Sequence, residues 1–169
     1  MLAIRGDQGG VRMTYLRGDL ELMSPSRTHE GIKTTLARML EAYAMERGLV
    51  LEGYGSWTVR NAPLEQGLEP DECYIVGDPN KDRPDLAIEV VWTSGGIDKL
   101  EVHRGLDVGE VWIWQRGVIE VHVLRDNDYA KVTASELVPG FDLAMAARCI
   151  LESDTQTAAV RWFLETVRE

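Results

Sequence analysis

The chain has 169 residues, of which 44% are hydrophobic and 27% are charged, and its formal net charge is −10. This composition is typical of a globular protein, and the length predicts one domain over residues 1–169. The negative charge argues against a broad nucleic-acid-binding surface, because such surfaces need Lys and Arg to neutralise phosphates. It does not exclude a small acidic metal site that acts on a phosphate.

The sequence also bears on the compartment. It contains no apolar run long enough to cross a membrane and no signal-peptide pattern at its N-terminus. Cys73 and Cys149 lie in apolar runs without metal-ligand spacing. We therefore expect reduced core thiols and a cytoplasmic protein.

The N-terminal part predicts a hairpin followed by a long helix. Strand-like runs at residues 13–16 and 20–23 predict a hairpin at the edge of the sheet. Ser24 is the candidate cap of the following helix, Pro25 stands in its first turn and Gly48 ends it. Apolar side chains recur at helical spacing at Ile32, Leu36, Leu40 and Tyr43.

The middle and C-terminal parts predict strands around a short helix. Residues 85–92 are apolar apart from their acids, as expected for a central strand buried on both faces. After a break at Ser94-Gly95-Gly96, residues 97–106 predict a helix, and residues 137–143 indicate a covering loop. Further strands are expected at 49–52, 57–60, 69–76, 110–114, 118–124 and 129–133, and a terminal helix at 155–167. This order predicts an α+β fold, with a mixed twisted β-sheet flanked by helices.

Two acids stand where buried strands do not usually carry them. Glu89 lies in the middle of the strand at 85–92, and Asp71 lies in the preceding strand-like run. An unpaired buried carboxylate costs free energy, so Glu89 should be protonated, ion-paired or bound to a metal. Two neighbouring carboxylates with room for water suit Mg²⁺ or Mn²⁺. The alternative is that Glu89 pairs with an arginine or with Lys99 and has no chemical role.

The order Pro70-Asp71, Glu89-Val90-Val91 and Lys99 resembles the PD-(D/E)XK nuclease superfamily. Within it, the chain resembles the restriction-endonuclease branch often called the Uma-two type. The resemblance also includes the segments Ser24-Pro25 to His29, 84–92, 96–100 and 109–114.

This resemblance implies a restriction-endonuclease-like core and the hydrolysis of phosphodiester bonds in DNA. It implies that Asp71 and Glu89 hold Mg²⁺ or Mn²⁺, with the backbone carbonyl of Val90 as a further ligand. A lysine would orient the attacking water and stabilise charge on the phosphate. The superfamily usually places this lysine two residues after the acid, where this chain has Val91. The similar branch places it on the following helix, where Lys99 fits; the alternative for Lys99 is a solvated helix face.

The resemblance adds candidates around this pair. Glu30 matches an acid that the superfamily often supplies from its first helix, or it is a surface glutamate favoured by the helix dipole. His29 lines the pocket or packs at the edge of the core, and the same alternatives hold for His103, one turn after Lys99. Glu69 and Asp85 each share a strand face with a proposed ligand, so either is a candidate supporting acid.

Trp112 and Trp114 share one strand face, with Val111 and Ile113 on the other. That much aromatic surface is either core or a protein interface. Because nucleases of this type often pair, the resemblance also implies a homodimer formed through this half of the sheet.

Two functions remain open from the sequence. The first is a metal-dependent DNA endonuclease that uses Asp71, Glu89 and Lys99, helped by Glu30. The second is a non-catalytic interaction or regulatory domain that retains the nuclease fold, which the acidity and the absence of a basic tract favour. A doubly wound nucleotide-binding protein is disfavoured, because Gly95-Gly96 follows a strand without a complete glycine-rich phosphate loop.

Overall fold

A computed structural model of the chain describes residues 11–91 and 96–168. The predicted strand end at Trp92 and the break at Ser94-Gly95 therefore lie outside the described residues. The elements are β1 (Arg12–Leu16), β2 (Asp19–Met23), α2 (Arg27–Arg47), β3 (Leu51–Gly53), β4 (Val59–Asn61), a 3-10 turn (Ala62–Leu64), β5 (Gln66–Leu68), β6 (Glu72–Val76), β7 (Leu86–Val91), α3 (Lys99–Gly105), β8 (Glu110–Gln115), β9 (Val118–Arg125), β10 (Asp128–Val132), α4 (Leu143–Glu152) and α5 (Gln156–Arg168).

The strands form two sheets. A six-stranded sheet has the order β10-β9-β8-β7-β6-β3, and a four-stranded sheet has the order β2-β1-β5-β4. Strands β7 and β8 are parallel and α3 connects them, whereas the other pairs are antiparallel. A parallel pair needs such a crossover, because a tight turn cannot reverse the chain twice. The predicted α+β class with a mixed sheet is confirmed.

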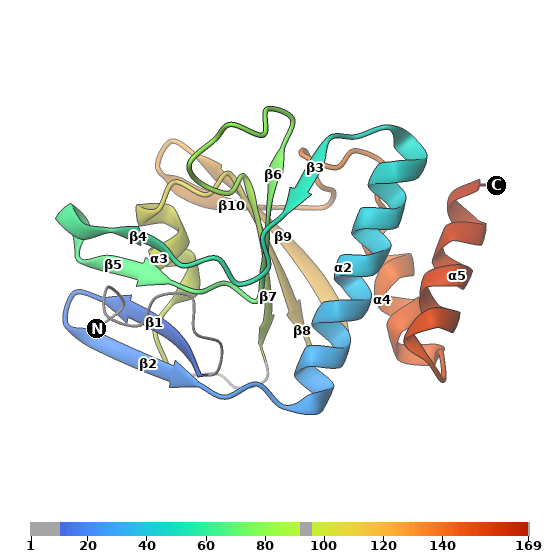
Figure 1. Cartoon of the computed structure of the whole chain (residues 1–169), viewed down its shortest axis with the longest axis horizontal. Helices are drawn as coiled ribbons and strands as arrows, with labels where there is room; N and C mark the ends of the chain where they lie inside the picture. The colour runs from blue at the N-terminus through green and yellow to red at the C-terminus, as the bar shows by residue number, and fades with distance from the viewer. Residues whose placement is uncertain (1–10, 92–95, 169) are drawn as a thin grey trace.

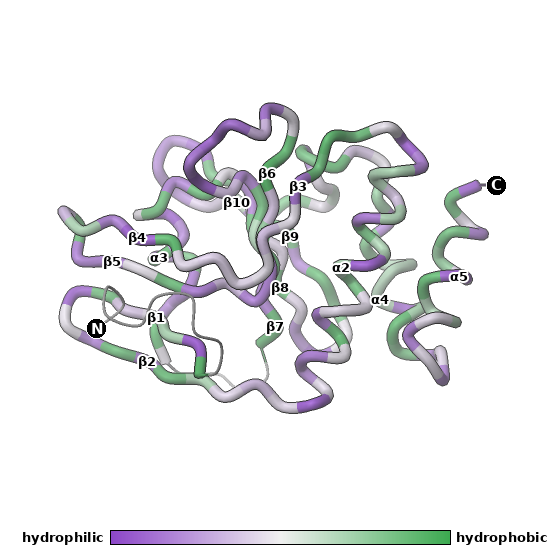
Figure 2. Tube along the Cα trace, in the orientation of Figure 1, coloured by the Kyte–Doolittle hydropathy of each residue, from purple (hydrophilic) through white to green (hydrophobic). Residues whose placement is uncertain are grey.

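The helices α2, α4 and α5 lie on one side of the large sheet, while the small sheet and α3 lie on the other (Figure 1). Hydrophobic and hydrophilic stretches alternate along α2, as expected for a helix with one face on the sheet (Figure 2). No helix within residues 11–91 and 96–168 is long and apolar enough to cross a membrane.

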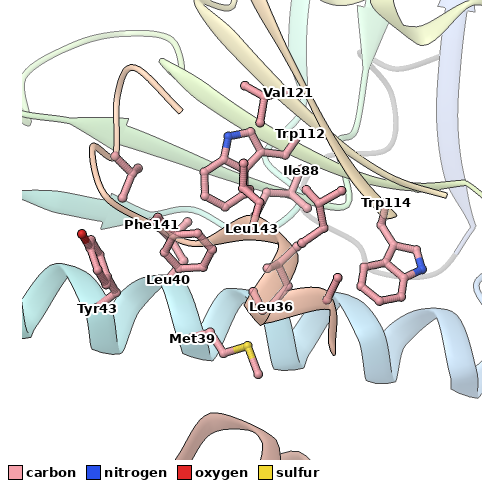
Figure 3. Packing of buried hydrophobic residues seen from close by; sticks show 14 of the residues in the cluster. Leu36, Met39, Leu40, Tyr43, Ile88, Trp112, Trp114, Val121, Phe141 and Leu143 are labelled. Atoms are coloured by element: carbon pink, nitrogen blue, oxygen red, sulfur yellow. The ribbon is translucent and has the colours of Figure 1, made fainter. Parts of the chain in front are cut away.

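The larger core fills the space between the six-stranded sheet and α2, α4 and α5 (Figure 3). Phe141 is its centre, with ring centroids 5.0 Å from Trp112, 4.9 Å from Phe163 and 5.3 Å from Tyr43. Trp112 and Trp114 are both buried here, so their surface belongs to the core and not to an exposed interface patch. The aromatic burial accounts for much of the packing free energy of this face.

A smaller core lies on the opposite face of the sheet, against α3 and the small sheet. Ala87 and Val111 point into it, together with Val102 of α3 and Leu68 of β5. Glu89 belongs to the same strand face as Ala87, since side chains alternate along a strand. The central acid is therefore directed into the layer between the two sheets.

The structure differs from the sequence analysis at three elements. The predicted hairpin exists, but it belongs to the small sheet, where β1 pairs with β5. The helix cap is Ser26 and not Ser24: the Ser26 hydroxyl accepts a bond from His29 N at 3.2 Å. No element was predicted over residues 144–152, where the structure has α4, capped by Asp142 through Met145 N at 2.9 Å.

Glu110 is a second buried acid, and its partners show what a purely structural carboxylate looks like here. It accepts bonds from Trp112 Nε1 and Ser135 Oγ, both at 2.6 Å, and from the backbone N–H groups of Glu136 and Leu137 at 2.9 and 3.2 Å. These are neutral donors that tie the covering loop to the start of β8. Glu110 is thereby satisfied without any cation.

We predict that Glu110→Gln lowers the free energy of unfolding by about 1–3 kcal/mol, because the amide nitrogen would face donors and leave buried groups unsatisfied. Urea denaturation measures this. Glu120→Gln is the matched control on β9, where a partly exposed surface pair with Lys131 should contribute less than about 1 kcal/mol. Equal losses for the two variants would contradict the structural role of Glu110.

Candidate functional site: a buried acid pair with a lysine

Glu89 lies in the middle of β7 and has no exposed surface. Its carboxylate contacts two side chains of α3: Lys99 Nζ is 2.6 Å from Oε2, and His103 Nε2 is 2.8 Å from Oε1. Lys99 and His103 are four residues apart, so they share the helix face that covers β7. His103 Nε2 and Glu89 Oε1 lie within hydrogen-bond distance, and a deprotonated carboxylate in this pair could only accept the bond.

Asp71 immediately precedes β6 and is also fully buried. Glu72 is paired with Ile88 in the antiparallel β6–β7 ladder, and this register brings Asp71 beside the C-terminal end of β7. There the N–H of Val90 donates to Asp71 Oδ2 at 2.7 Å. His29 Nε2, from the first turn of α2, lies 3.0 Å from the same oxygen.

Arg12 is the residue at this site that the sequence reasoning missed. It lies on β1, its Nη1 donates to Asp71 Oδ1, and its Nη2 donates to Glu30 Oε1 at 2.8 Å. Glu30 also contacts Lys33 Nζ at 3.1 Å. Glu30 therefore reaches Asp71 through Arg12. The only available signal was a basic residue at the start of a strand, and such residues are common on surfaces.

The remaining predicted residues lie further out. Glu69 braces β1, since its carboxylate accepts bonds from Met13 N and Thr58 Oγ1, both at 3.2 Å. Asp85 lies at the opposite end of β7, where it accepts bonds from Lys81 Nζ and Val76 N at 2.8 Å. The structure does not bring Asp85 to the acid pair, because Asp85 precedes β7 whereas Glu89 lies in the middle of that strand.

Lys99 is the first residue of α3, whereas the sequence predicted a helix that begins at residue 97. Asp98 caps this helix through Leu100 N at 3.0 Å. At the other end, a Cβ on Gly105 would overlap the side chain of Gln66, and Asn61 Nδ2 donates to the Gly105 carbonyl at 3.0 Å. Because Gly105 has no side chain, α3 packs closely on the small sheet. This packing helps to set the position of Lys99 at the other end of the helix.

The charges of the site reinforce one another. Burial alone would raise the pKa of Asp71, but the bond from His29, the charges of Lys99 and Arg12 and the Val90 N–H together hold it below its usual value. Burial would likewise lower the pKa of Lys99, but the negative charges of Glu89 and Asp71 raise it. Both groups are therefore ionised at neutral pH.

A cavity of about 740 Å³ borders the cluster. His29, Val90 and Lys99 line it, and these residues also contact Asp71 or Glu89. Glu21 and Asp98 line it as well, but Glu21 accepts a bond from the Ile97 N–H at 3.0 Å and Asp98 caps α3. Lys99 therefore lies at the wall of this cavity.

The oxygen atoms of the two carboxylates are of the type that a hard divalent ion prefers. Asp71 and Glu89 are adjacent buried carboxylates, and Mg²⁺ typically takes one or two carboxylates with waters completing its shell. Among the residues that the structure describes, no three His, Cys, Asp or Glu side chains converge on one metal position. Asp71 and Glu89 would therefore be the only acidic ligands there, and each of their oxygens already faces a donor.

The fold and this cluster define an α+β protein with an acid pair and a lysine held between two sheets. Residues 1–149 match the model of the Uma2 family, described as "Putative restriction endonuclease", and the chain belongs to this family. A solved structure with the same fold is a putative nuclease belonging to DUF820 from Anabaena variabilis ATCC 29413, at 11% identity and a TM-score of 0.56. The match covers 89% of this chain and 90% of that chain. Comparison with curated proteins gives no significant match.

The lowered pKa of Asp71 predicts how stability depends on pH. Its charged form stabilises the fold above the unfolded pKa of about 3.9, and this contribution is lost as the pH falls through the lower folded pKa. The difference in unfolding free energy between wild type and Asp71→Asn should thus be largest near neutral pH and shrink below about pH 4. Urea denaturation across this range measures it, and a difference that stays constant would contradict the ionised, paired state of Asp71.

Proposed function

We propose that this protein is a divalent-metal-dependent endonuclease that hydrolyses phosphodiester bonds in DNA. The observation that carries the proposal is the convergence of Asp71, Glu89 and Lys99 beside a cavity, with Lys99 Nζ 2.6 Å from Glu89 Oε2. A solvated Lys99 would have left only two acids. Membership of a family described as restriction endonucleases supports the same conclusion.

Lys99 acts as a cation and not as a base. Its pKa is raised by Glu89 and Asp71, so at neutral pH it keeps its proton and cannot accept one from water. A protonated amine at the wall of the cavity stabilises the negative charge that develops on a phosphate under attack. It also donates a hydrogen bond that orients the attacking water.

The two histidines position the acids. His103 holds Glu89 through Oε1, and His29 lies against Asp71 Oδ2, so neither carboxylate is free to rotate. Residues locked in this way preserve the geometry that a reacting group needs. In the proposal, Asp71, Glu89 and the Val90 carbonyl hold Mg²⁺ or Mn²⁺. When bound, the ion activates water and polarises the phosphoryl oxygen.

The acidic surface limits how DNA is bound. With a net charge of −10, the chain has little cationic area to neutralise a long duplex. The proposal therefore places DNA recognition near the site, and a second copy in the proposed homodimer would be equally acidic and would not supply the missing cations. The free buried thiols Cys73 and Cys149 fit a reducing cytoplasm, and burial raises the pKa of the Cys73 thiol to about 12.

A non-catalytic interaction or regulatory domain is the second candidate. The full occupation of both carboxylates by internal donors favours it, because such a cluster is stable without a metal. The two candidates differ in whether the acid pair does chemistry or only holds β6, β7 and α3 together.

Cleavage of supercoiled plasmid in Mg²⁺ or Mn²⁺ tests the proposal. Asp71→Asn, Glu89→Gln and Lys99→Met should each reduce the rate by about 100-fold or more, because each removes charge at the reacting phosphate or its metal. Lys131→Met is the control, since its amine pairs with Glu120 on the surface at 2.6 Å, and its rate should match the wild type.

Circular dichroism checks that each variant is folded. Undiminished cleavage by folded Glu89→Gln would rule out the assigned site. Absence of cleavage by the wild type in both metals would favour the non-catalytic candidate.

A further inference from the structure

Arg12 contacts Oδ1 of Asp71, the oxygen that does not face the Val90 N–H and His29. We propose that Arg12 is an internal cation that competes with the divalent ion for Asp71, so that metal binding exchanges the Arg12–Asp71 pair for a metal–Asp71 contact. This inference rests on the proposed function, in which Asp71 and Glu89 hold the ion. It assigns Arg12 a role in controlling metal affinity.

The position of Arg12 is built into the fold. Its side chain is only 11% exposed, and it belongs to a strand that pairs on both sides, with β2 and with β5. The next residue, Met13, is fixed by its N–H bond to Glu69 Oε2 at 3.2 Å. Such a guanidinium is held at Asp71 by the strand and does not reach it by chance from a flexible loop.

The two oxygens of Asp71 have different surroundings. Oδ2 is occupied by the Val90 N–H and by His29 Nε2, at 2.7 and 3.0 Å. Oδ1 faces the Arg12 guanidinium. A second cation at Oδ1 would stand beside a permanent positive charge, and arginine cannot lose its proton to relieve the repulsion. Arg12 must therefore move away from Oδ1, or the ion binds more weakly.

Glu30 provides the alternative partner. Arg12 Nη2 already donates to Glu30 Oε1 at 2.8 Å, while Glu30 is 40% exposed and also contacts Lys33. When Arg12 leaves Asp71, the contact with Glu30 keeps its charge paired. Glu30 thus acts as the acceptor of the displaced guanidinium, and not as a third metal ligand.

The competition has a cost and a benefit that can both be measured. Without a metal, the cation at Asp71 offsets the repulsion between two adjacent buried carboxylates, which otherwise destabilises the fold. With a metal, the same cation must be displaced, which weakens binding. Removal of the Arg12 charge should therefore destabilise the metal-free protein and at the same time strengthen metal binding. Removal of an arginine with only a structural role would not strengthen metal binding.

Calorimetric titration of the full chain with Mn²⁺ tests this. We expect Arg12→Met to bind Mn²⁺ about tenfold more tightly than the wild type, the order of a typical coupling free energy between sites. Its melting temperature in EDTA should be lower, and the rise on adding Mn²⁺ should be larger, since a ligand stabilises the state it binds. Arg17→Met is the matched control in the turn that follows the same strand: Arg17 is 63% exposed, pairs with Glu101 at 3.0 Å, and should leave Mn²⁺ affinity unchanged.

Glu30→Gln gives an independent test that keeps the Arg12–Asp71 pair. It removes the second acceptor, so the guanidinium stays on Asp71 and Mn²⁺ should bind more weakly than in the wild type. If the wild type binds Mn²⁺ and Arg12→Met binds it no more tightly, the inference is overturned, while the proposed metal site stands. Should Arg12→Met fail to fold, unchanged or tighter binding by Glu30→Gln would overturn the inference in its place. No Mn²⁺ binding by any of these proteins would overturn both the inference and the proposed metal site.

Discussion

Two carboxylates buried side by side must be neutralised, and the architecture around Asp71 and Glu89 meets this requirement. Both have no exposed surface, and each ionised group would be costly without a partner. The partners come from three separate elements: Lys99 from α3, His29 from α2 and Arg12 from β1. The crossover helix and the small sheet are therefore more than packing, because they deliver the cations that make the acid pair tolerable.

A comparison with Glu110 shows that this arrangement is not the ordinary solution for a buried acid in this fold. Glu110 is satisfied by an indole, a hydroxyl and two backbone N–H groups, none of which carries charge. Asp71 and Glu89 are instead paired with the cationic side chains of Arg12 and Lys99, and Lys99 lines a cavity. Lys99 even begins α3, where the positive end of the helix dipole disfavours a cation. The attraction of Glu89 outweighs this local preference.

The sequence predicted the acid pair because each acid leaves a local signal. Glu89 interrupts an apolar run and Asp71 follows a proline, so residue type pointed to the acid pair, whereas Lys99 was assigned through the family resemblance. Arg12 left no such signal: it is brought to Asp71 by the pairing of β1 with β5, a contact between residues more than fifty positions apart. The misassigned Asp85 shows the converse limit, because alternation gives the face of a strand but not the distance along it.

The same reasoning explains the outcome for the fold. Helix α2 and the strands β7 to β10 have strong periodicity or continuous apolar runs, and their positions were close to those predicted. Helix α4 was not predicted, although its sequence has three alanines and a good cap at Asp142. The preceding Pro139-Gly140 is typical of a loop and hides the start of the helix. The split into two sheets could not be predicted from the sequence. Strands as short as β4 and β5 show too little periodicity to be recognised, and only their pairing with neighbouring strands defines them.

In the proposed function, Asp71 and Glu89 together form a metal site. The most direct measurement is an anomalous difference map from a crystal of the protein soaked in Mn²⁺, recorded at the manganese absorption edge. The account predicts a peak between the two carboxylates, with Lys99 nearby and Arg12 turned toward Glu30. A map with no peak at this position, and with Arg12 still bound to Asp71, would contradict it.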